Sequence, residues 1–344
     1  MDLGAPLVGR GACRCHCLQS RQAGLAGDRS VSLEQATAPV LVTLGVVLAA
    51  LLGARLWLWL REGQLPESIR RELAQRIASW WVMVGVFSVA LLLSRTAFLT
   101  FFAFVSFLAL KEYFSLIPTR RADRRVLFWA YLAVPVQYYW IADGWYGMFI
   151  IFIPVYLFLF LPFRMVLTGE TQNFLRSVGT LHWGLMTTVF ALSHLAALLV
   201  LPLRETFPAG PAGPVFYLVL LTELNDVAQY VWGRLLGRRR IVPSVSPNKT
   251  WEGWIGGVLT TAALGGALGP WLTPLGWIEG LWVGLGVGAV GFVGDVVMSA
   301  LKRDLGVKDT SSLIPGHGGV LDRLDSLIYT APLFYHFLRY VHGA

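Results

Sequence analysis

The sequence predicts an all-α fold, a polytopic integral membrane bundle of about nine or ten transmembrane helices. Composition is the first reason: 56% of the 344 residues are hydrophobic, only 14% are charged, and the mean hydropathy is +0.60. These values exceed what the surface of a soluble domain carries. The second reason is length, because apolar runs recur that are long enough to cross a hydrocarbon core of about 30 Å. The third is continuity: the runs are unbroken, whereas the strands of a membrane barrel alternate, so helices are expected.

Ten apolar runs are candidate spans, or nine if the fourth is only half-inserted. They lie at 39–60, 78–93, 97–117, 126–141, 146–166, 178–202, 214–233, 254–272, 280–300 and 326–341.

The connections between these runs differ in charge. With ten spans, the connections rich in Arg and Lys all fall on one side, and those on the other side hold only Arg95 and Arg204 as basic residues. By the positive-inside rule the basic side is cytoplasmic. We therefore expect a multi-pass protein of the cell inner (plasma) membrane. The net charge of +8 fits this topology and contact with anionic membrane lipids, and no nucleic acid partner is expected because no basic run carries interleaved aromatic residues.

Three regions are expected along the chain. They are a disordered or mis-assigned tail over 1–38, a transmembrane scaffold over 39–202, and a transmembrane region over 203–344 that carries the chemistry. The scaffold has few polar residues inside its spans, and we expect His182 and His194 to pack between helices there. Nearly all the carboxylates inside apolar runs belong to the third region.

The cysteines all lie in the tail, as Cys13, Cys15 and Cys17 around His16. This cluster lacks the two-residue spacing and the second ligand pair of a zinc finger. We therefore expect no functional metal site in the tail.

The span 280–300 ends in a polar helix face. Asp295, Ser299 and Lys302 follow one another at i, i+4 and i+7, so they share one side of the helix. A lone carboxylate inside the bilayer is costly. It is either neutralised, by protonation or by a salt bridge to Lys302, or it binds a divalent cation, for which carboxylate oxygens are suitable ligands.

Two further carboxylates, Asp322 and Asp325, stand three residues apart where the last span begins. That spacing places both on one helix face. Together with Asp295 they would supply the carboxylates for one Mg²⁺, or for a pair of ions bridged by phosphates.

The segment between these carboxylates is typical of phosphate binding. It holds Lys302, Arg303, Lys308, Asp309 and a Pro-Gly-His-Gly-Gly turn that includes His317, Gly318 and Gly319. Free backbone N–H groups of glycines wrap phosphate oxygens, and basic side chains neutralise them. An ordinary polar loop would explain the glycines alone, but not their combination with the flanking acids and bases.

A second polar cluster lies in the span 214–233. Thr222, Asp226, Gln229 and Gly233 repeat at helical spacing and predict a polar stripe facing the bundle interior. Hydrogen bonding between helices is the structural alternative. The following loop holds Ser246, Lys249 and Thr250 just before another helix, where the helix dipole and free amides favour a triphosphate.

The glycines at 286, 288 and 291 match a dinucleotide-binding pattern. They lie inside a helix-long apolar run with no preceding strand, so the pattern fails its structural test. We expect Gly284, Gly288, Gly291 and Gly294 of this run to let another helix approach closely.

The long polar segment identifies a family resemblance. The pattern S-x-x-K-R-x4-K-D-x4-(L/I)-P-G-H-G-G-x-x-D-R-x-D, present as Ser299–Asp325, resembles the signature of the phosphatidate cytidylyltransferases (CDP-diacylglycerol synthases). The elements Ser246–Gly253 and Asp226–Gly233 are similar to the same family. The resemblance covers about 214–341. Asn225 and Gln229 depart from the usual small residues there, which indicates a diverged bacterial paralogue branch.

The resemblance implies transfer of CMP from CTP to phosphatidic acid, giving CDP-diacylglycerol and pyrophosphate in phospholipid biosynthesis, with Mg²⁺ and a second cation such as K⁺ as cofactors. It implies a homodimer with its active site facing the cytoplasm. The expected catalytic residues are Asp295, Lys302, Lys308, Asp309, Asp322, Arg323 and Asp325, with Asp295, Asp322 and Asp325 on the metal. The expected substrate-binding residues are Asp226, Ser246, Lys249, Thr250, Ser299, Arg303, His317, Gly318 and Gly319.

Two alternatives stay open at this point. A related CTP-dependent membrane enzyme, a polyprenol kinase or an ether-lipid cytidylyltransferase, would share the metal site. A cation-coupled transporter would use Glu223, Asp226 and Asp295 as an ion path, and inverted repeats would favour it, but the sequence has no such internal symmetry.

Overall fold

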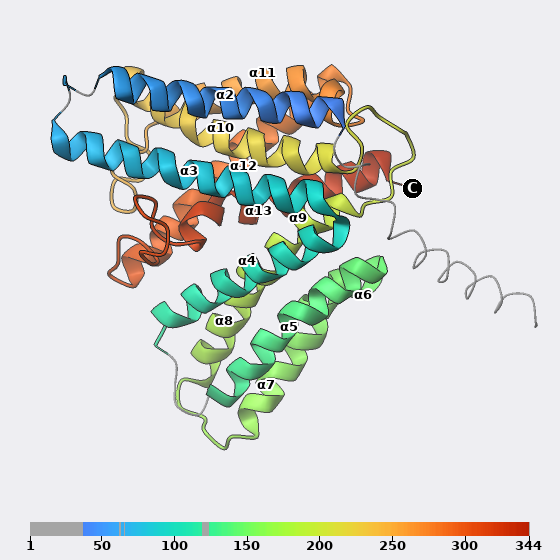
Figure 1. Cartoon of the computed structure of the whole chain (residues 1–344). Helices are drawn as coiled ribbons and strands as arrows, with labels where there is room; N and C mark the ends of the chain where they lie inside the picture. The colour runs from blue at the N-terminus through green and yellow to red at the C-terminus, as the bar shows by residue number, and fades with distance from the viewer. Residues whose placement is uncertain (1–36, 62, 65, 119–123, 344) are drawn as a thin grey trace, which may run out of the picture.

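The computed structural model describes residues 37–343 apart from 62, 65 and 119–123, and this part of the chain is almost entirely helical (Figure 1). The helices are α2 (Ala38–Leu60), α3 (Glu67–Leu93), α4 (Arg95–Leu116), α5 (Arg124–Asp143), α6 (Tyr146–Ile151), α7 (Phe158–Val166), α8 (Phe174–Leu185), α9 (Leu192–Leu199), α10 (Ala212–Leu236), α11 (Trp251–Leu272), α12 (Trp277–Asp304) and α13 (Leu321–His342). The π-helical segments η3 (Phe152–Leu157) and η4 (Met186–Ala191) join α6 to α7 and α8 to α9. The cysteine cluster lies outside the described residues.

The predicted spans agree with this helical pattern. Each apolar run lies within a helix or a joined pair of helices and extends past it by at most three residues. Seven of the described helices are long and apolar enough to cross a membrane. Among the others, α10 and α13 carry the charged residues of the two polar clusters, which lowers their hydropathy. The predicted class, a multi-pass helical membrane protein, is confirmed.

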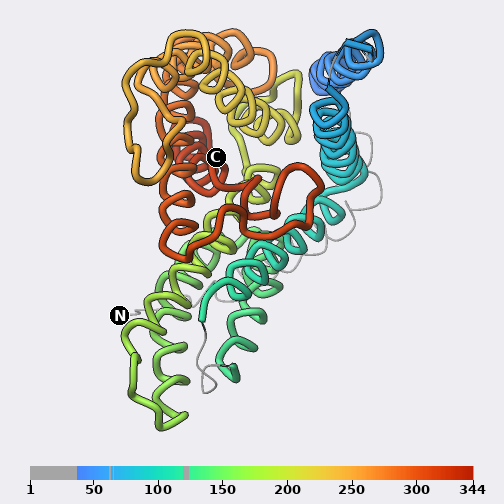
Figure 2. Tube along the Cα trace, turned by 90° about the vertical axis from the view of Figure 1, so that its left-hand side faces the viewer, coloured from blue at the N-terminus to red at the C-terminus, as the bar shows by residue number. Residues whose placement is uncertain are grey.

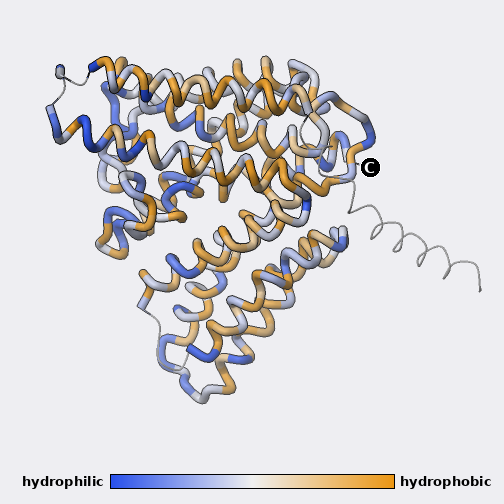
Figure 3. Tube along the Cα trace, viewed as in Figure 1, coloured by the Kyte–Doolittle hydropathy of each residue, from blue (hydrophilic) through white to orange (hydrophobic). Residues whose placement is uncertain are grey.

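The helices form two groups. Figure 1 shows α2, α3 and α10 running in a similar direction, whereas α4, α5, α7 and α8 slant away from them. The closest packing joins α10, α11, α12 and α13, and α9 connects this bundle to the slanting group through α13 and α10. The helices are mostly apolar along their length, and polar stretches gather near their ends (Figure 3).

Small residues allow the bundle to pack closely. Gly280 and Gly284 of α12 lie against α11 so tightly that a Cβ at Gly284 would collide with the Thr261 backbone. The hydroxyl of Tyr217 donates to the Gly265 carbonyl of α11 at 2.9 Å. Gly288, within the dinucleotide-like pattern, faces Val258 of α11. The expectation that these glycines serve helix packing is confirmed.

His194 also has the packing role expected of it. The ring is fully buried, its Nδ1 lies 2.8 Å from the Phe190 carbonyl, and it contacts the rings of Phe149 and Tyr335.

The loop between α12 and α13, the red segment in Figure 2, lies between the α10–α13 bundle and the helices α3 and α4. Ser79 of α3 donates to the Pro315 carbonyl at 2.7 Å, and Arg303 donates to the Val245 carbonyl at 3.2 Å. The loop therefore contacts α3, and the last turn of α12 contacts the loop before α11.

Candidate active site

One cavity of about 250 Å³ collects all of the predicted catalytic residues except Lys308. It is lined by Glu223, Asp226, Lys249, Asp295, Lys302, Asp309, Asp322, Arg323 and Asp325. α10, α12 and α13 each contribute carboxylates, and the loops before α11 and α13 contribute Lys249 and Asp309. Two polar clusters that lie far apart in the sequence thus form one acidic and basic site.

Two ion pairs organise this cavity. The Lys249 ammonium contacts the Asp295 carboxylate, and the Lys302 Nζ lies 2.8 Å from Asp322 Oδ1. The alternative in which Lys302 neutralises Asp295 within the same helix is wrong. Lys302 points instead to the start of α13, because the loop brings Asp322 closer to it, and Lys249 from another loop takes its place. Ser299 donates to Asp295 Oδ1 at 3.3 Å from the same helix face, as predicted.

Asp322 holds the glycine-rich loop in its conformation. Its buried Oδ2 accepts hydrogen bonds from Thr310 N at 2.7 Å, Thr310 Oγ1 at 2.9 Å and Gly319 N at 2.9 Å. Gly318 has φ +81°, and a Cβ there would approach Asp322 Oδ2 within 2.8 Å. A left-handed backbone and a closely approaching carboxylate both explain why glycine occupies this position.

Glu112 of α4 is a site-supporting residue that the sequence reasoning missed. Its buried carboxylate accepts from Ser311 Oγ at 2.7 Å, Leu321 N at 2.9 Å, Val320 N at 3.0 Å and Thr310 Oγ1 at 3.3 Å. It thereby satisfies free N–H groups at the start of α13, where a negative charge is also favourable. The signal was present: a glutamate inside the apolar run 97–117 is expensive in a membrane unless it has partners.

Polar side chains of α10 bind its neighbours in the bundle. Asn225 is fully buried and accepts from Thr261 Oγ1 at 3.1 Å while donating to the Gly288 carbonyl at 3.4 Å. Ser326 of α13 donates to Asp226 Oδ2 at 3.3 Å. The unusual asparagine therefore links α10 to α11 and α12, and Asp226 faces the cavity with a partner on α13.

Two larger cavities adjoin the acidic one. A cavity of about 540 Å³ shares Asp226 and Lys249 with it and is also lined by Gly233, Ser246 and Thr250. Thr250 is the N-cap of α11, because its Oγ1 accepts from Gly253 N at 3.2 Å.

The other cavity, of about 770 Å³, shares Glu223, Asp226, Asp309 and Arg323 with the acidic cavity and adds Lys308 and residues 316–318. Partial burial, with the nearby charges of Arg323 and Arg76, lowers the pKa of His317 below its ordinary value, so this ring is neutral near pH 7.

Arg303 is exposed and joins the last turn of α12 to the loop before α11 through its bond to Val245. Gly319 has no room for a side chain, because a Cβ would collide with Thr310 and Glu112. These two predicted binding residues have structural roles in this arrangement.

The carboxylate oxygens of this cavity are chemically suitable ligands for a hard cation, but the positions of the described side chains do not form a coordination site. Carboxylate oxygens are the ligands that Mg²⁺ prefers. Within the described residues, however, no three His, Cys, Asp or Glu side chains converge as a metal cage. Asp295 is paired with Lys249, and the oxygens of Asp322 accept hydrogen bonds from Lys302 and from the loop before α13. The remaining carboxylates of the cavity are Glu223, Asp226, Asp309 and Asp325.

Comparison with known proteins reveals three informative relatives. "Uncharacterized protein YnbB" of Escherichia coli is 48% identical over 295 residues, which is 86% of this chain and 95% of the relative. A phosphatidate cytidylyltransferase of Synechocystis is 43% identical over 136 residues, 39% of this chain and 45% of the relative. A phosphatidate cytidylyltransferase of Haemophilus influenzae is 39% identical over 168 residues, 46% of this chain and 58% of the relative. The match to these two enzymes therefore spans about half of their length.

A sequence profile extends the likeness beyond those partial matches. The profile of the cytidylyltransferase family matches residues 74–341, which include α4 with Glu112 as well as every residue that lines the acidic cavity. Because this match covers most of the chain and its polar centre, the protein belongs to the cytidylyltransferase family and is a nucleotidyltransferase of the membrane.

Proposed function

We propose that the protein transfers CMP from CTP to phosphatidic acid, forming CDP-diacylglycerol and pyrophosphate. The observation that supports this most is the acidic cavity, in which carboxylates from three helices lie among Lys249, Lys302 and Arg323. Lys and Arg side chains attract phosphates, and Asp and Glu carboxylates bind the divalent metal ion that accompanies a nucleoside triphosphate. Family membership makes cytidylyl transfer the reaction to test first.

The proposed step needs no protein nucleophile. A phosphate oxygen of phosphatidic acid attacks the α-phosphorus of CTP, the bond from that phosphorus to the bridging oxygen of the β-phosphate breaks, and pyrophosphate leaves with the electron pair. A phosphomonoester is already ionised near neutral pH. The side chains therefore act by holding two polyanions in line and by offsetting their charge.

We propose that Mg²⁺ binds Asp295 and Asp325 together with the phosphates of CTP, and that Asp322 completes the set or orients it through Lys302. When bound, the ion would offset charge on the triphosphate and on the leaving pyrophosphate. Lys249 would move from Asp295 to a phosphate as the nucleotide enters. Ser246 and Thr250 line the 540 Å³ cavity, where they would hold the triphosphate. Lys308 and Arg323 line the 770 Å³ cavity, where they would contact the lipid phosphate.

The proposal includes the orientation and assembly of the enzyme. The nucleotide is cytoplasmic, so the loops before α11 and α13 would face the cytoplasm of a bacterial inner membrane. We also propose that the protein binds a second cation such as K⁺ and that it forms a homodimer.

The test is a reaction of the purified protein with CTP, Mg²⁺ and phosphatidic acid in detergent. We expect release of pyrophosphate that depends on phosphatidic acid, with CDP-diacylglycerol identified by mass spectrometry. The same mixture with a polyprenol instead of phosphatidic acid tests the alternative that the protein is a polyprenol kinase. A phosphorylated polyprenol and CDP, with no product from phosphatidic acid, would overturn the proposal.

A further inference from the structure

We propose that the apolar cavity between α3, α4 and α13 holds an acyl chain of the acceptor lipid, and that Phe87 and Phe101 at its far end limit the chain length. This inference rests on the proposed function, because it names where the acceptor's hydrocarbon part lies. The cavity has a volume of about 670 Å³.

The wall of this acyl chamber is apolar and comes from helices far apart in the sequence. Met83 of α3, Val105 and Leu108 of α4, and Leu327 of α13 line it. An apolar cavity of this size beside a polar centre suits the hydrocarbon part of a ligand.

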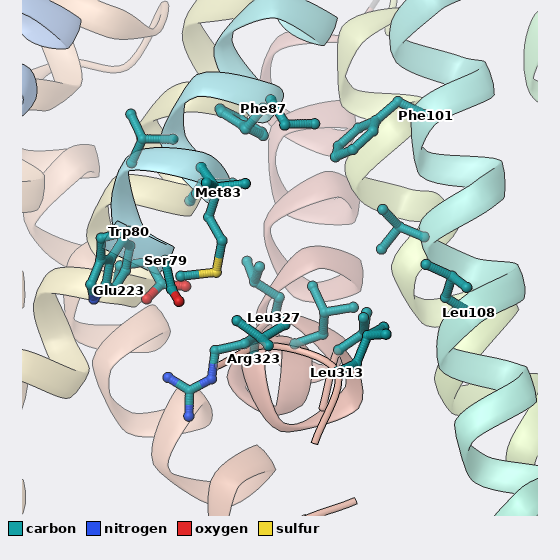
Figure 4. Close-up of a pocket in the computed structure, with 18 of the residues that line it drawn as sticks. Ser79, Trp80, Met83, Phe87, Phe101, Leu108, Glu223, Leu313, Arg323 and Leu327 are labelled. Carbon is teal, nitrogen blue, oxygen red and sulfur yellow. The ribbon is translucent and has the colours of Figure 1, made fainter. Parts of the chain in front are cut away.

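The chamber joins the polar site at one end. Glu223 and Arg323 line both the chamber and the acidic cavity. Figure 4 shows the guanidinium of Arg323 at the end of the chamber opposite Phe87 and Phe101, with Met83 between them. A phosphate paired with Arg323 would therefore place its ester-linked chain in the chamber, so charge and polarity both select an anionic lipid as the occupant.

The other end is closed by packed aromatic rings. The Phe87 ring lies 6.1 Å from Phe98, 6.4 Å from Phe102 and 6.4 Å from Phe216, measured between centroids, and Phe101 lies 5.1 Å from Phe102. Ser79 binds the loop next to the polar site. Phe87 follows it on the same helix about 12 Å further along the axis. A fixed distance between a phosphate anchor and a rigid end wall is the geometry that selects for length.

A lipid has a route into the chamber from the bilayer. Val82 and Val86 both line the chamber and are 63% and 48% exposed on the outer side of α3. Within a membrane these side chains meet lipid, so the chamber opens toward acyl chains at this face of α3.

The first experiment compares acceptors that share a headgroup and differ in chain length. Dioctanoyl, dimyristoyl and distearoyl phosphatidic acids are assayed with purified wild type, Met83→Trp and Phe87→Ala. Met83→Trp fills the chamber, so we expect kcat/KM to fall about tenfold more for the distearoyl than for the dioctanoyl acceptor. Phe87→Ala removes the end wall, so we expect the distearoyl to dimyristoyl ratio of kcat/KM to rise about threefold or more.

The matched control is Val89→Trp, which adds the same ring to the exposed side of α3. We expect its chain-length ratios to equal those of the wild type. Ratios between acceptors do not depend on the fraction of enzyme that is folded, so partial misfolding of Phe87→Ala leaves the comparison valid. Equal changes for all chain lengths in Met83→Trp, or the same ratio change in Val89→Trp, would overturn the acyl chamber.

A binding measurement separates this inference from the proposed reaction. Phosphatidic acid with a photoreactive group at the end of one chain is crosslinked to the protein without CTP or Mg²⁺. We expect labelling of 82–87 and 101–108 that unlabelled phosphatidic acid suppresses and Met83→Trp abolishes. Such labelling without any CMP transfer would reject the proposed function and keep the chamber, whereas transfer with labelling that Met83→Trp leaves unchanged would reject the chamber.

Discussion

Asp295 and Asp322 both present a carboxylate to one cavity, but their different contacts indicate different roles. Asp295 is held by Lys249, a partner that can move to a phosphate, and by Ser299. Asp322 is buried and accepts hydrogen bonds from Lys302, Thr310 and Gly319. Replacing each carboxylate by its amide isostere should therefore give different results.

For Asp295→Asn we expect nucleotidyl transfer to fall at least about a hundredfold, because the metal loses a charged ligand at the reacting phosphates. The melting temperature should stay near that of the wild type. For Asp322→Asn we expect a similar loss of activity together with a lower melting temperature, because the loop loses its anchor. Assays at several Mg²⁺ concentrations and thermal melts in detergent measure both. The exposed Asp304→Asn is the control, and near-normal rates of Asp295→Asn at saturating Mg²⁺ would refute its role on the metal.

Lys249→Ala should raise the KM for CTP about tenfold, because a charge-assisted contact to the triphosphate is lost. The KM for phosphatidic acid should change much less. Initial rates with each substrate varied in turn provide the comparison. A selective loss of affinity for the lipid would place this loop on the acceptor side.

The helices depend mainly on local sequence, so their positions and the residues that share a helix face could be predicted. Apolar runs and helical spacing predicted that Asp295 and Ser299 share a face of α12, because both depend only on residues within one helix. The partner of Asp295 was not predictable, since Lys249 reaches it only after α10, α11 and α12 have packed. Glu112 lies 198 residues from Thr310, so the sequence could mark it as an unusual buried acid but not say what it binds.

α4 is expected to position the glycine-rich loop through Glu112. Glu112→Gln places an amide donor where four hydrogen-bond donors converge, so we expect a loss of about 1–3 kcal/mol in stability. We also expect kcat to fall about tenfold to a hundredfold, as is usual when a group that orients an active-site ligand is removed.

Glu112→Asp should recover part of the activity, and the exposed neighbour variant Lys111→Gln should behave like the wild type. A melting temperature that falls while kcat per folded protein stays unchanged would show that Glu112 supports the fold only.

At the scale of the whole molecule, the polar loops gather at one end of the bundle. Arg303 at the end of α12 donates to the Val245 carbonyl in the loop before α11, while the opposite end is closed where Arg204 N donates to the His342 carbonyl. Charge counting predicted the same division of loops, because each span reverses the side on which the next connection lies.

Single-cysteine labelling tests this topology directly. In a variant without the native cysteines, we expect Ser312→Cys and Arg239→Cys to react only from the cytoplasmic side and Thr206→Cys only from the other side. All three positions are exposed. Reaction of Ser312→Cys and Thr206→Cys from the same side would show that the number of spans between them is wrong.

The central claim is that the α-phosphate of CTP, and not its γ-phosphate, moves to the lipid. The most direct measurement incubates the purified protein with phosphatidic acid, Mg²⁺ and CTP radiolabelled either at the α- or at the γ-phosphorus. We predict that the α label enters the lipid fraction and the γ label is recovered as pyrophosphate. Lipid labelled from the γ position, or no lipid labelled from either, would contradict the account.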